Sequence, residues 1–121
     1  MKIHASGEDY LKTIFVLKKQ QGMVRSVDVA RYMNVSKPSV CNAVSLLQEG
    51  KFLVMDEDYC LRLTDNGLKI AEEIYERHCF FKERLLAAGV DPIKAEKEAC
   101  KMEHAISDES FRKLKNAIST M

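Results

Sequence analysis

The chain has 121 residues, of which 46% are hydrophobic, enough to build one domain or two small domains with a packed interior. Its formal net charge is only +1, so charge alone does not indicate a nucleic-acid or membrane-surface protein. Four scattered cysteines form no C-x-x-C pair, which excludes a disulfide framework. We expect no signal peptide and no membrane span, and therefore a cytoplasmic protein.

The sequence opens with two predicted helices. Apolar spacing predicts the first over residues 8–20, with Ser6 as its N-cap and Gly22 as its stop. Ser26 is the expected N-cap of a second, shorter helix that reaches Met33. Both helices have one apolar face, so we expect them to pack against a common core.

A tight turn at residues 34–35 separates the second helix from a third, which Ser36 caps and Gly50 ends. Short strands are expected at residues 52–55 and 59–63, joined by a polar turn. Two helices joined by a tight turn and followed by a hairpin are typical of a winged helix-turn-helix.

The second half of the sequence predicts helices only. Thr64 is expected to cap a long helix that runs to about residue 88, and Asp91-Pro92 starts a fifth helix that ends near residue 106. Ser107 then caps a last helix. The predicted fold is mainly α: a winged helix-turn-helix DNA-binding domain over 1–64, then an all-helical dimerisation and metal-binding domain over 65–121.

The start of the third helix is the candidate DNA-reading surface, because the second helix of a helix-turn-helix enters the major groove with its N-terminal residues against the bases. Short hydroxyls, an amide and a lysine there suit phosphate and base contacts. The alternative is an ordinary solvated helix face, and the acidic turn at 56–58 is a poor partner for phosphate. The candidate contacts are Ser36, Lys37, Pro38, Ser39, Asn42 and Ser45.

Cys100, Glu103 and His104 carry the metal hypothesis. Their spacing of i, i+3 and i+4 places a thiol, a carboxylate and an imidazole on one face of a helix. Sulfur beside imidazole and carboxylate suits a divalent transition metal better than calcium or magnesium. The alternative is a buried cysteine beside two surface polar residues. His78 and Asp9 could add a nitrogen and an oxygen, although each alone is better explained as a core histidine and a helix N-terminal charge.

Four segments together resemble the metal-dependent repressors of the diphtheria toxin repressor type, which include the manganese transport regulators. The resemblance covers nearly the whole chain. It implies a homodimeric winged-helix repressor that binds palindromic double-stranded operator DNA when loaded with Fe(II) or Mn(II), in a short form without the appended barrel domain. It implies no membrane and no small-molecule substrate. The segments are Ser6–Leu11, Val35–Val40, Leu63–Gly67 and Glu98–Glu109.

The resemblance also implies the ligands: Asp9, Cys100, Glu103 and His104 in a principal site, with His78 at a further ligand position. Asp9 matches the manganese-type members and Cys100 matches the iron-type members, so the sequence is a hybrid. The thiolate favours Fe(II), then Mn(II), with Zn(II), Co(II) or Ni(II) as substitutes in vitro.

The sequence departs from the family at two places. Lys12 stands where manganese-type members have a glutamate, which argues against their paired metal cluster. At the ancillary site of the iron-type members this chain has Lys82 and Glu96. A second site built from His78, Glu96 and Glu83 remains open, as does the choice between iron and manganese.

The expected function is therefore a metal-activated repressor of metal-homeostasis genes, in which the ion ties the DNA-binding domain to the helical domain. One alternative is a winged-helix regulator without metal that senses oxidants or small molecules through a thiol such as Cys41. A metalloenzyme with Glu103 as its general base is a weaker alternative, because no H-E-x-x-H motif or oxyanion loop is present.

Overall fold

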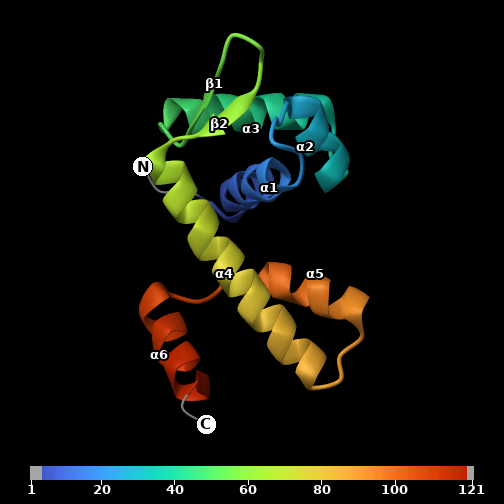
Figure 1. Ribbon diagram of the computed structural model, residues 1–121, viewed down its shortest axis with the longest axis vertical. Helices are drawn as coiled ribbons and strands as arrows, with labels where there is room; N and C mark the ends of the chain where they lie inside the picture. The colour runs from blue at the N-terminus through green and yellow to red at the C-terminus, as the bar shows by residue number, and fades with distance from the viewer. Residues whose placement is uncertain (1–3, 120–121) are drawn as a thin grey trace. The chain divides into compact units, whose positions relative to one another are not determined.

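The computed structural model describes residues 4–119 and confirms the mainly helical expectation. The chain forms two compact units that divide between Glu72 and Glu73, which we call the head and the body. No helix within residues 4–119 is long and apolar enough to cross a membrane. The described elements are α1 (Ala5–Gln21), α2 (Ser26–Met33), α3 (Lys37–Glu49), β1 (Leu53–Met55), β2 (Leu61–Leu63), α4 (Asp65–Ala87), α5 (Pro92–Met102) and α6 (Asp108–Ser119) (Figure 1).

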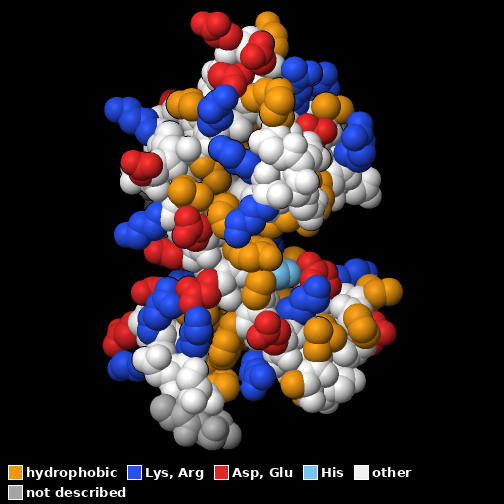
Figure 2. Space-filling model, viewed as in Figure 1, with side chains coloured by type: hydrophobic (Ala, Val, Ile, Leu, Met, Phe, Trp, Pro, Cys, Tyr) orange, Lys and Arg blue, Asp and Glu red, His pale blue; other side chains and the backbone are white. Residues whose placement is uncertain are grey.

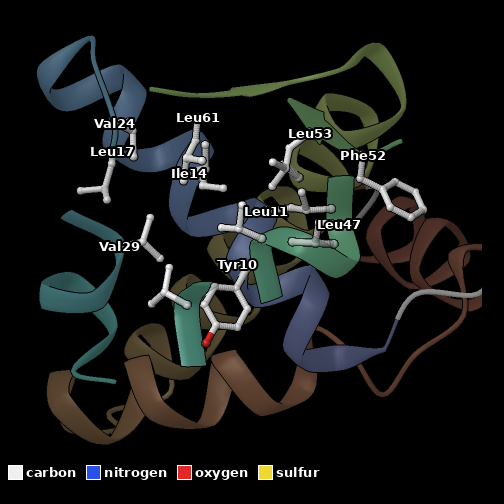
Figure 3. Packing of buried hydrophobic residues seen from close by; sticks show 13 residues of the cluster. Tyr10, Leu11, Ile14, Leu17, Val24, Val29, Leu47, Phe52, Leu53 and Leu61 are labelled. Carbon is white, nitrogen blue, oxygen red and sulfur yellow. The ribbon is translucent and has the colours of Figure 1, made fainter. Parts of the chain in front are cut away.

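The core of the head gathers apolar side chains from every element of the winged helix-turn-helix. Leu11 and Ile14 of α1 are buried at its centre, beside Val29 of α2, Leu47 of α3 and Leu53 of β1 (Figure 3). Because these residues recur at helical or alternating spacing, each element presents one apolar face to the same interior. This core fixes the position of α3 within the head.

The helix-turn-helix forms as the sequence predicts. Asn34 adopts the left-handed conformation, with φ 56° and ψ 49°, which ends α2 and turns the chain sharply toward α3. Ser36 then caps α3, because its hydroxyl oxygen accepts a hydrogen bond from the Ser39 amide at 3.2 Å. Pro38 lies in the first turn of α3, where its missing amide proton costs nothing.

Two predicted caps are wrong. α1 begins at Ala5 with His4 in the N-cap position, so Ser6 lies inside its first turn. α2 begins at Ser26 itself, and Arg25 occupies the N-cap position. Arg25 is held in extended conformation by a bridge to Cys60, and its amide donates to the Asp28 carboxylate at 2.8 Å. The Asp28 carboxylate thus caps the start of α2 in place of the predicted cap Ser26.

The wing is an antiparallel hairpin with Leu53 opposite Leu63 and Met55 opposite Leu61. It projects beyond α3 in Figure 1. The strands are shorter than predicted, because Tyr59 has a φ of 63° and therefore belongs to the turn. Asp56 organises this turn: its Oδ1 accepts from the amides of Asp58 and Cys60, both at 2.9 Å.

Thr64 joins the wing to α4 and acts as the predicted cap. Its hydroxyl donates to the Lys51 carbonyl at 2.7 Å and accepts from the Gly67 amide at 3.2 Å. The start of α4 also passes close to the backbone of Phe52. Only glycine fits at position 67, because a Cβ there would lie 1.9 Å from the Phe52 carbonyl oxygen. The first two turns of α4, about residues 65–72, belong to the head.

The body has its own small core, in which Phe81 of α4, Ala99 of α5 and Phe111 of α6 are buried together. Asp91 caps α5 as predicted, because its carboxylate accepts from the amides of Ile93 and Lys94. On the face that Figure 2 shows, acidic and basic side chains are mixed over each unit, apart from a group of acidic side chains at the upper end of the head.

α5 ends at Met102, four residues earlier than the predicted end near residue 106. The last α-helical bond joins the Glu103 amide to the Ala99 carbonyl at 3.0 Å, and the Ala105 amide turns to the Met102 carbonyl at 3.1 Å instead. Ser107 then caps α6, because its hydroxyl oxygen accepts a hydrogen bond from the Ser110 amide. Glu103 and His104 therefore lie in a turn beyond α5, and only Cys100 lies in the helix.

Candidate metal centre and nucleic-acid interface

His78 lies at the centre of the candidate metal site in the body. It comes from the middle of α4, and only 10% of its side chain is exposed. Its Nδ1 is 2.9 Å from Glu103 Oε2, and its Nε2 is 3.0 Å from Glu96 Oε1. Cys100 Sγ lies 3.7 Å from the same Nδ1. One imidazole is thus in contact with potential ligands from α5 and from the turn that follows it.

Glu103 is the most deeply placed of the acidic residues, because its side chain is fully buried. Besides the contact with His78, its Oε1 lies 3.3 Å from His104 Nε2. A buried carboxylate is costly unless cationic or hydrogen-bonding groups face it. Two imidazoles supply such partners here, and a divalent ion would be a stronger one.

The donor atoms fit a transition metal. The ligand atoms of His78, Glu96 and Cys100 all lie within 4.8 Å of one another. Ligands about 2.0–2.3 Å from one ion are separated by at most about twice that distance, so only small shifts are needed to close around it. The mixture of sulfur, nitrogen and carboxylate oxygen matches iron, manganese, cobalt or zinc rather than calcium.

The structure therefore gathers most of the predicted ligands in two overlapping contacts within the body. Cys100 lies with His78 and Glu96, whereas Glu103 and His104 form the other contact, and His78 joins the two. The sequence spacing alone grouped Cys100 with Glu103 and His104. It did not reveal that His78 stands between them, because that depends on how α4 packs against α5.

Glu96 already has an ammonium partner. Lys82 Nζ lies 2.8 Å from Glu96 Oε2, on the side of the carboxylate away from the His78 contact. Burial raises the pKa of Glu96, but the hydrogen bond from Lys82 and the charge of His78 outweigh it, so the pKa lies below its ordinary value. The Glu96 contact raises the pKa of Lys82. Glu83, the other candidate for a second site, is exposed on α4 and is not part of this group.

Asp9 belongs to the head, where it lies near the start of α1. Its Oδ1 is 3.8 Å from the ammonium of Lys12, one helical turn along. Lys12 thus places a positive charge beside the Asp9 carboxylate. The head supplies one candidate ligand and the body supplies the others.

Arg77 is a further residue of this region, which the sequence motifs did not indicate. It is 8% exposed, and its Nη1 donates to the carbonyls of Ile106 at 3.0 Å and Glu103 at 3.4 Å. These carbonyls lie in the turn that carries Glu103 and His104. The available signal was a cation directly before His78, at a position where α4 turns its buried side toward the body.

The candidate DNA-reading surface is the exposed side of α3. All six predicted contacts are exposed, whereas Val40, Val44 and Leu47 on the opposite side are buried in the head. Ser36 and Ser39 hydroxyls are 2.8 Å apart at the start of the helix. The amide protons and hydroxyls of this first turn suit phosphate oxygens, and Asn42 suits a base edge farther along.

Comparison with known proteins supports both halves of this description. Residues 2–59 match the family model described as iron dependent repressor, N-terminal DNA binding domain. Residues 64–121 match the model described as iron dependent repressor, metal binding and dimerisation domain.

Individual relatives are consistent with these two family models. The chain is 31% identical over 110 residues to an HTH-type transcriptional regulator of Methanocaldococcus jannaschii, covering 89% of this chain and 88% of that protein. It is 35% identical over 104 residues to the transcriptional regulator MntR of Escherichia coli O6:H1, covering 86% of this chain and 67% of MntR. The structure of the manganese regulator SloR superposes with a TM-score of 0.83 at 26% identity, covering 93% of this chain.

The chain spans about half of the SloR chain, 53% of its length. Across the part that is shared, the winged helix-turn-helix and the helical body occur in the same order. Both family models match in sequence order and together cover most of the chain, and the relative from Methanocaldococcus is matched along nearly its whole length. The chain belongs to the iron-dependent repressor family of transcriptional regulators.

Proposed function

We propose that this protein is a metal-activated transcriptional repressor that binds a palindromic operator as a homodimer and controls genes of metal-ion homeostasis. The observation that carries the proposal is the buried contact of His78 with Glu103 and Cys100, next to His104. Four side chains with metal-binding donor atoms converge there from α4, α5 and the following turn. Such a concentration of ligands has no evident role in DNA binding itself.

The ligands proposed for the principal site are Asp9, Cys100, Glu103 and His104, with His78 as a further ligand. Fe(II) or Mn(II) would supply the positive charge that these donors share, and Zn(II), Co(II) or Ni(II) would substitute in vitro. Cys100 must lose its proton to bind, so the metal affinity of the protein should rise with pH.

Asp9 would link metal binding to DNA binding, because it belongs to the head whereas the other proposed ligands belong to the body. Two heads of a dimer must reach operator half-sites about one helical turn, roughly 34 Å, or a multiple of that apart. Heads that are free to move must be ordered on binding, which reduces affinity. Ligands from both units on one ion would order the heads before DNA is met.

The exposed face of α3 is proposed to enter the major groove. Ser36, Lys37, Pro38 and Ser39 would then lie at the phosphate backbone and the first bases, and Asn42 and Ser45 would face bases farther along. The carboxylate of Asp56 is engaged within the wing by two amides and by Arg62 Nε at 3.0 Å. The wing tip is acidic, so it should add little affinity for phosphate.

We further propose that the protein acts in the cytoplasm and has no enzymatic activity of its own. The family is one of transcriptional regulators, and the side chains of His78 and Glu103 in the body are buried. Glu103 contacts two imidazoles, and its side chain is fully buried, so it does not face solvent as a general base would have to.

The test is selection of double-stranded DNA from a random-sequence library, carried out anaerobically with Fe(II), Mn(II), Zn(II) or chelator. We expect a palindromic sequence to be enriched with Fe(II) or Mn(II) and its affinity to fall when chelator is added. Equal affinity with chelator, together with loss of binding after mild oxidation, would contradict the proposal. That outcome would favour the alternative in which the exposed thiol of Cys41 on α3 senses oxidants.

A further inference from the structure

Arg77 makes an unusual set of contacts for a residue on the buried side of a helix. Its Nη1 donates to the Ile106 and Glu103 carbonyls, and its Nη2 lies 3.6 Å from Asp108 Oδ1. The guanidinium carbon lies 5.7 Å from the centre of the Phe111 ring. One side chain of α4 thereby connects both ends of the turn between α5 and α6.

We propose that Arg77 is a positioning residue, which holds this turn in the conformation that presents Glu103 and His104 to a divalent transition metal. The inference rests on the proposed function and names a residue that acts on the same site without touching the ion. Glu103 and Ile106 bracket His104 and Ala105, so fixing their two carbonyls limits the backbone freedom of the two residues between them.

The carbonyl groups at the end of α5 and in the following turn need hydrogen-bond donors, which the Arg77 guanidinium supplies. The last carbonyls of α5 and those of the turn have no partner within the helix, and buried carbonyls without partners are costly. A guanidinium satisfies several acceptors at once, because its nitrogens form a rigid planar fork. A lysine ammonium has no such fork, so it would reach fewer of these groups from the same position.

By holding the turn, Arg77 would preorganise the ligands Glu103 and His104 for metal binding. A turn that is already in the binding conformation does not have to be ordered when an ion arrives, whereas a mobile one must be. Residues that orient metal ligands typically change metal affinity about 10–100-fold when they are replaced. We expect Arg77 to act at this level, although its contacts are with the backbone rather than with the ligand side chains.

The chain offers a matched control in Arg112. Its Nε lies 3.5 Å from the same Asp108 oxygen, and its guanidinium carbon lies 5.4 Å from the same Phe111 ring. Its remaining contact is with Glu76, at 2.9 Å, rather than with the carbonyls of the turn. The two arginines therefore share Asp108 and Phe111, but Arg77 is buried and holds the ligand-bearing turn, whereas the side chain of Arg112 is 45% exposed and does not.

The experiment compares Arg77→Gln, Arg77→Lys and Arg112→Gln in the full chain, using Co(II) as an anaerobic spectroscopic probe. We expect the affinity for Co(II) to fall about 10–100-fold in Arg77→Gln and by a smaller factor in Arg77→Lys. Arg112→Gln should stay within about twofold of the parent protein. At saturating Co(II), Arg77→Gln should regain the DNA affinity of the parent protein, because the ion then holds the turn.

A second measurement does not depend on metal. Amide hydrogen exchange of Glu103 and Ala105 in metal-free protein should be faster in Arg77→Gln than in Arg112→Gln, since these amides of the turn bond to carbonyls at the end of α5. Equal Co(II) affinities and equal exchange rates in the two variants would overturn the proposal. If Arg77→Gln does not fold, unchanged affinity in Arg77→Lys would overturn it as well.

These outcomes separate this inference from the proposed function. A parent protein that does not bind Co(II) would contradict the metal-binding role, and the exchange rates would still test whether Arg77 holds the turn. A parent protein that binds Co(II), with Arg77 and Arg112 variants indistinguishable, would contradict only the role of Arg77.

Discussion

At the scale of a residue, the His78 ring joins the two groups of candidate metal ligands. Both of its ring nitrogens are within 3.0 Å of a carboxylate oxygen, Nδ1 at Glu103 and Nε2 at Glu96. A neutral imidazole has only one N–H and can donate to only one of these carboxylates, whereas an imidazolium can donate to both. A metal at either nitrogen would replace one of the carboxylate contacts, and the other would then set the tautomer.

Cys100 should be the residue that decides metal preference. Replacing it in Cys100→Ala removes the only sulfur among the proposed ligands, so Co(II) affinity should fall at least about tenfold. The absorption band from thiolate to Co(II) should disappear as well. Cys79 is the matched control, since it is also half-buried and lies next to His78 on α4.

The expected result is therefore loss of the sulfur band in Cys100→Ala and its retention in Cys79→Ala, measured by anaerobic titration. A band that survives in the first variant and vanishes in the second would show that the wrong thiol has been assigned. Thermal unfolding of both metal-free variants would establish that neither substitution disrupts the body.

At the scale of an element, the wing depends on Asp56. Bonds from the Cys60 amide, from Arg62 and from the Asp58 amide hold the pKa of Asp56 below its ordinary value. A lowered pKa in the folded protein means that this carboxylate stabilises the fold above its unfolded pKa, near 3.8. That stabilisation is lost as the pH falls through the lower, folded value.

We predict that Asp56→Ala lowers Tm by a few degrees at pH 7, and that the difference from the parent protein shrinks once the pH is well below 3.8. Thermal unfolding at several pH values measures this directly. Asp58→Ala, two residues away in the same turn, should change Tm little, because Asp58 is exposed. A difference for Asp56→Ala that stays constant down to the lowest pH would mean that its ionised form is not what stabilises the wing.

Element boundaries also show what could be predicted from sequence. Local capping patterns succeeded where the cap and its helix are contiguous, as with Ser36, Thr64, Asp91 and Ser107. Ser26 failed because Arg25 pairs with Cys60, a contact far along the chain. Such long-range contacts override local preference and leave no mark in the neighbouring sequence.

The same distinction applies to the candidate site. Cys100, Glu103 and His104 are close in sequence, so their proximity could be predicted, although α5 ends before the last two. The contact of His78 with Glu96, and the role of Arg77 in the turn, depend on how α4, α5 and α6 pack. Those contacts became visible only in the structure, and the assignment of all these residues as metal ligands stays a prediction.

At the scale of the whole molecule, the chain consists of two units that share α4. The helix begins in the head, capped by Thr64, and carries His78 and Arg77 in the body. Asp9 is the one proposed ligand in the head. If metal binding and DNA binding are coupled through it, thermodynamic reciprocity requires each to strengthen the other by the same factor.

The most direct test of this account measures Mn(II) affinity with and without the selected operator, in the parent protein and in Asp9→Ala. We predict that operator DNA tightens Mn(II) binding about 5–150-fold in the parent protein, corresponding to roughly 1–3 kcal/mol. In Asp9→Ala the body should still bind Mn(II), but the operator should no longer change its affinity. Full coupling in Asp9→Ala would contradict the claim that an ion shared by head and body switches on DNA binding.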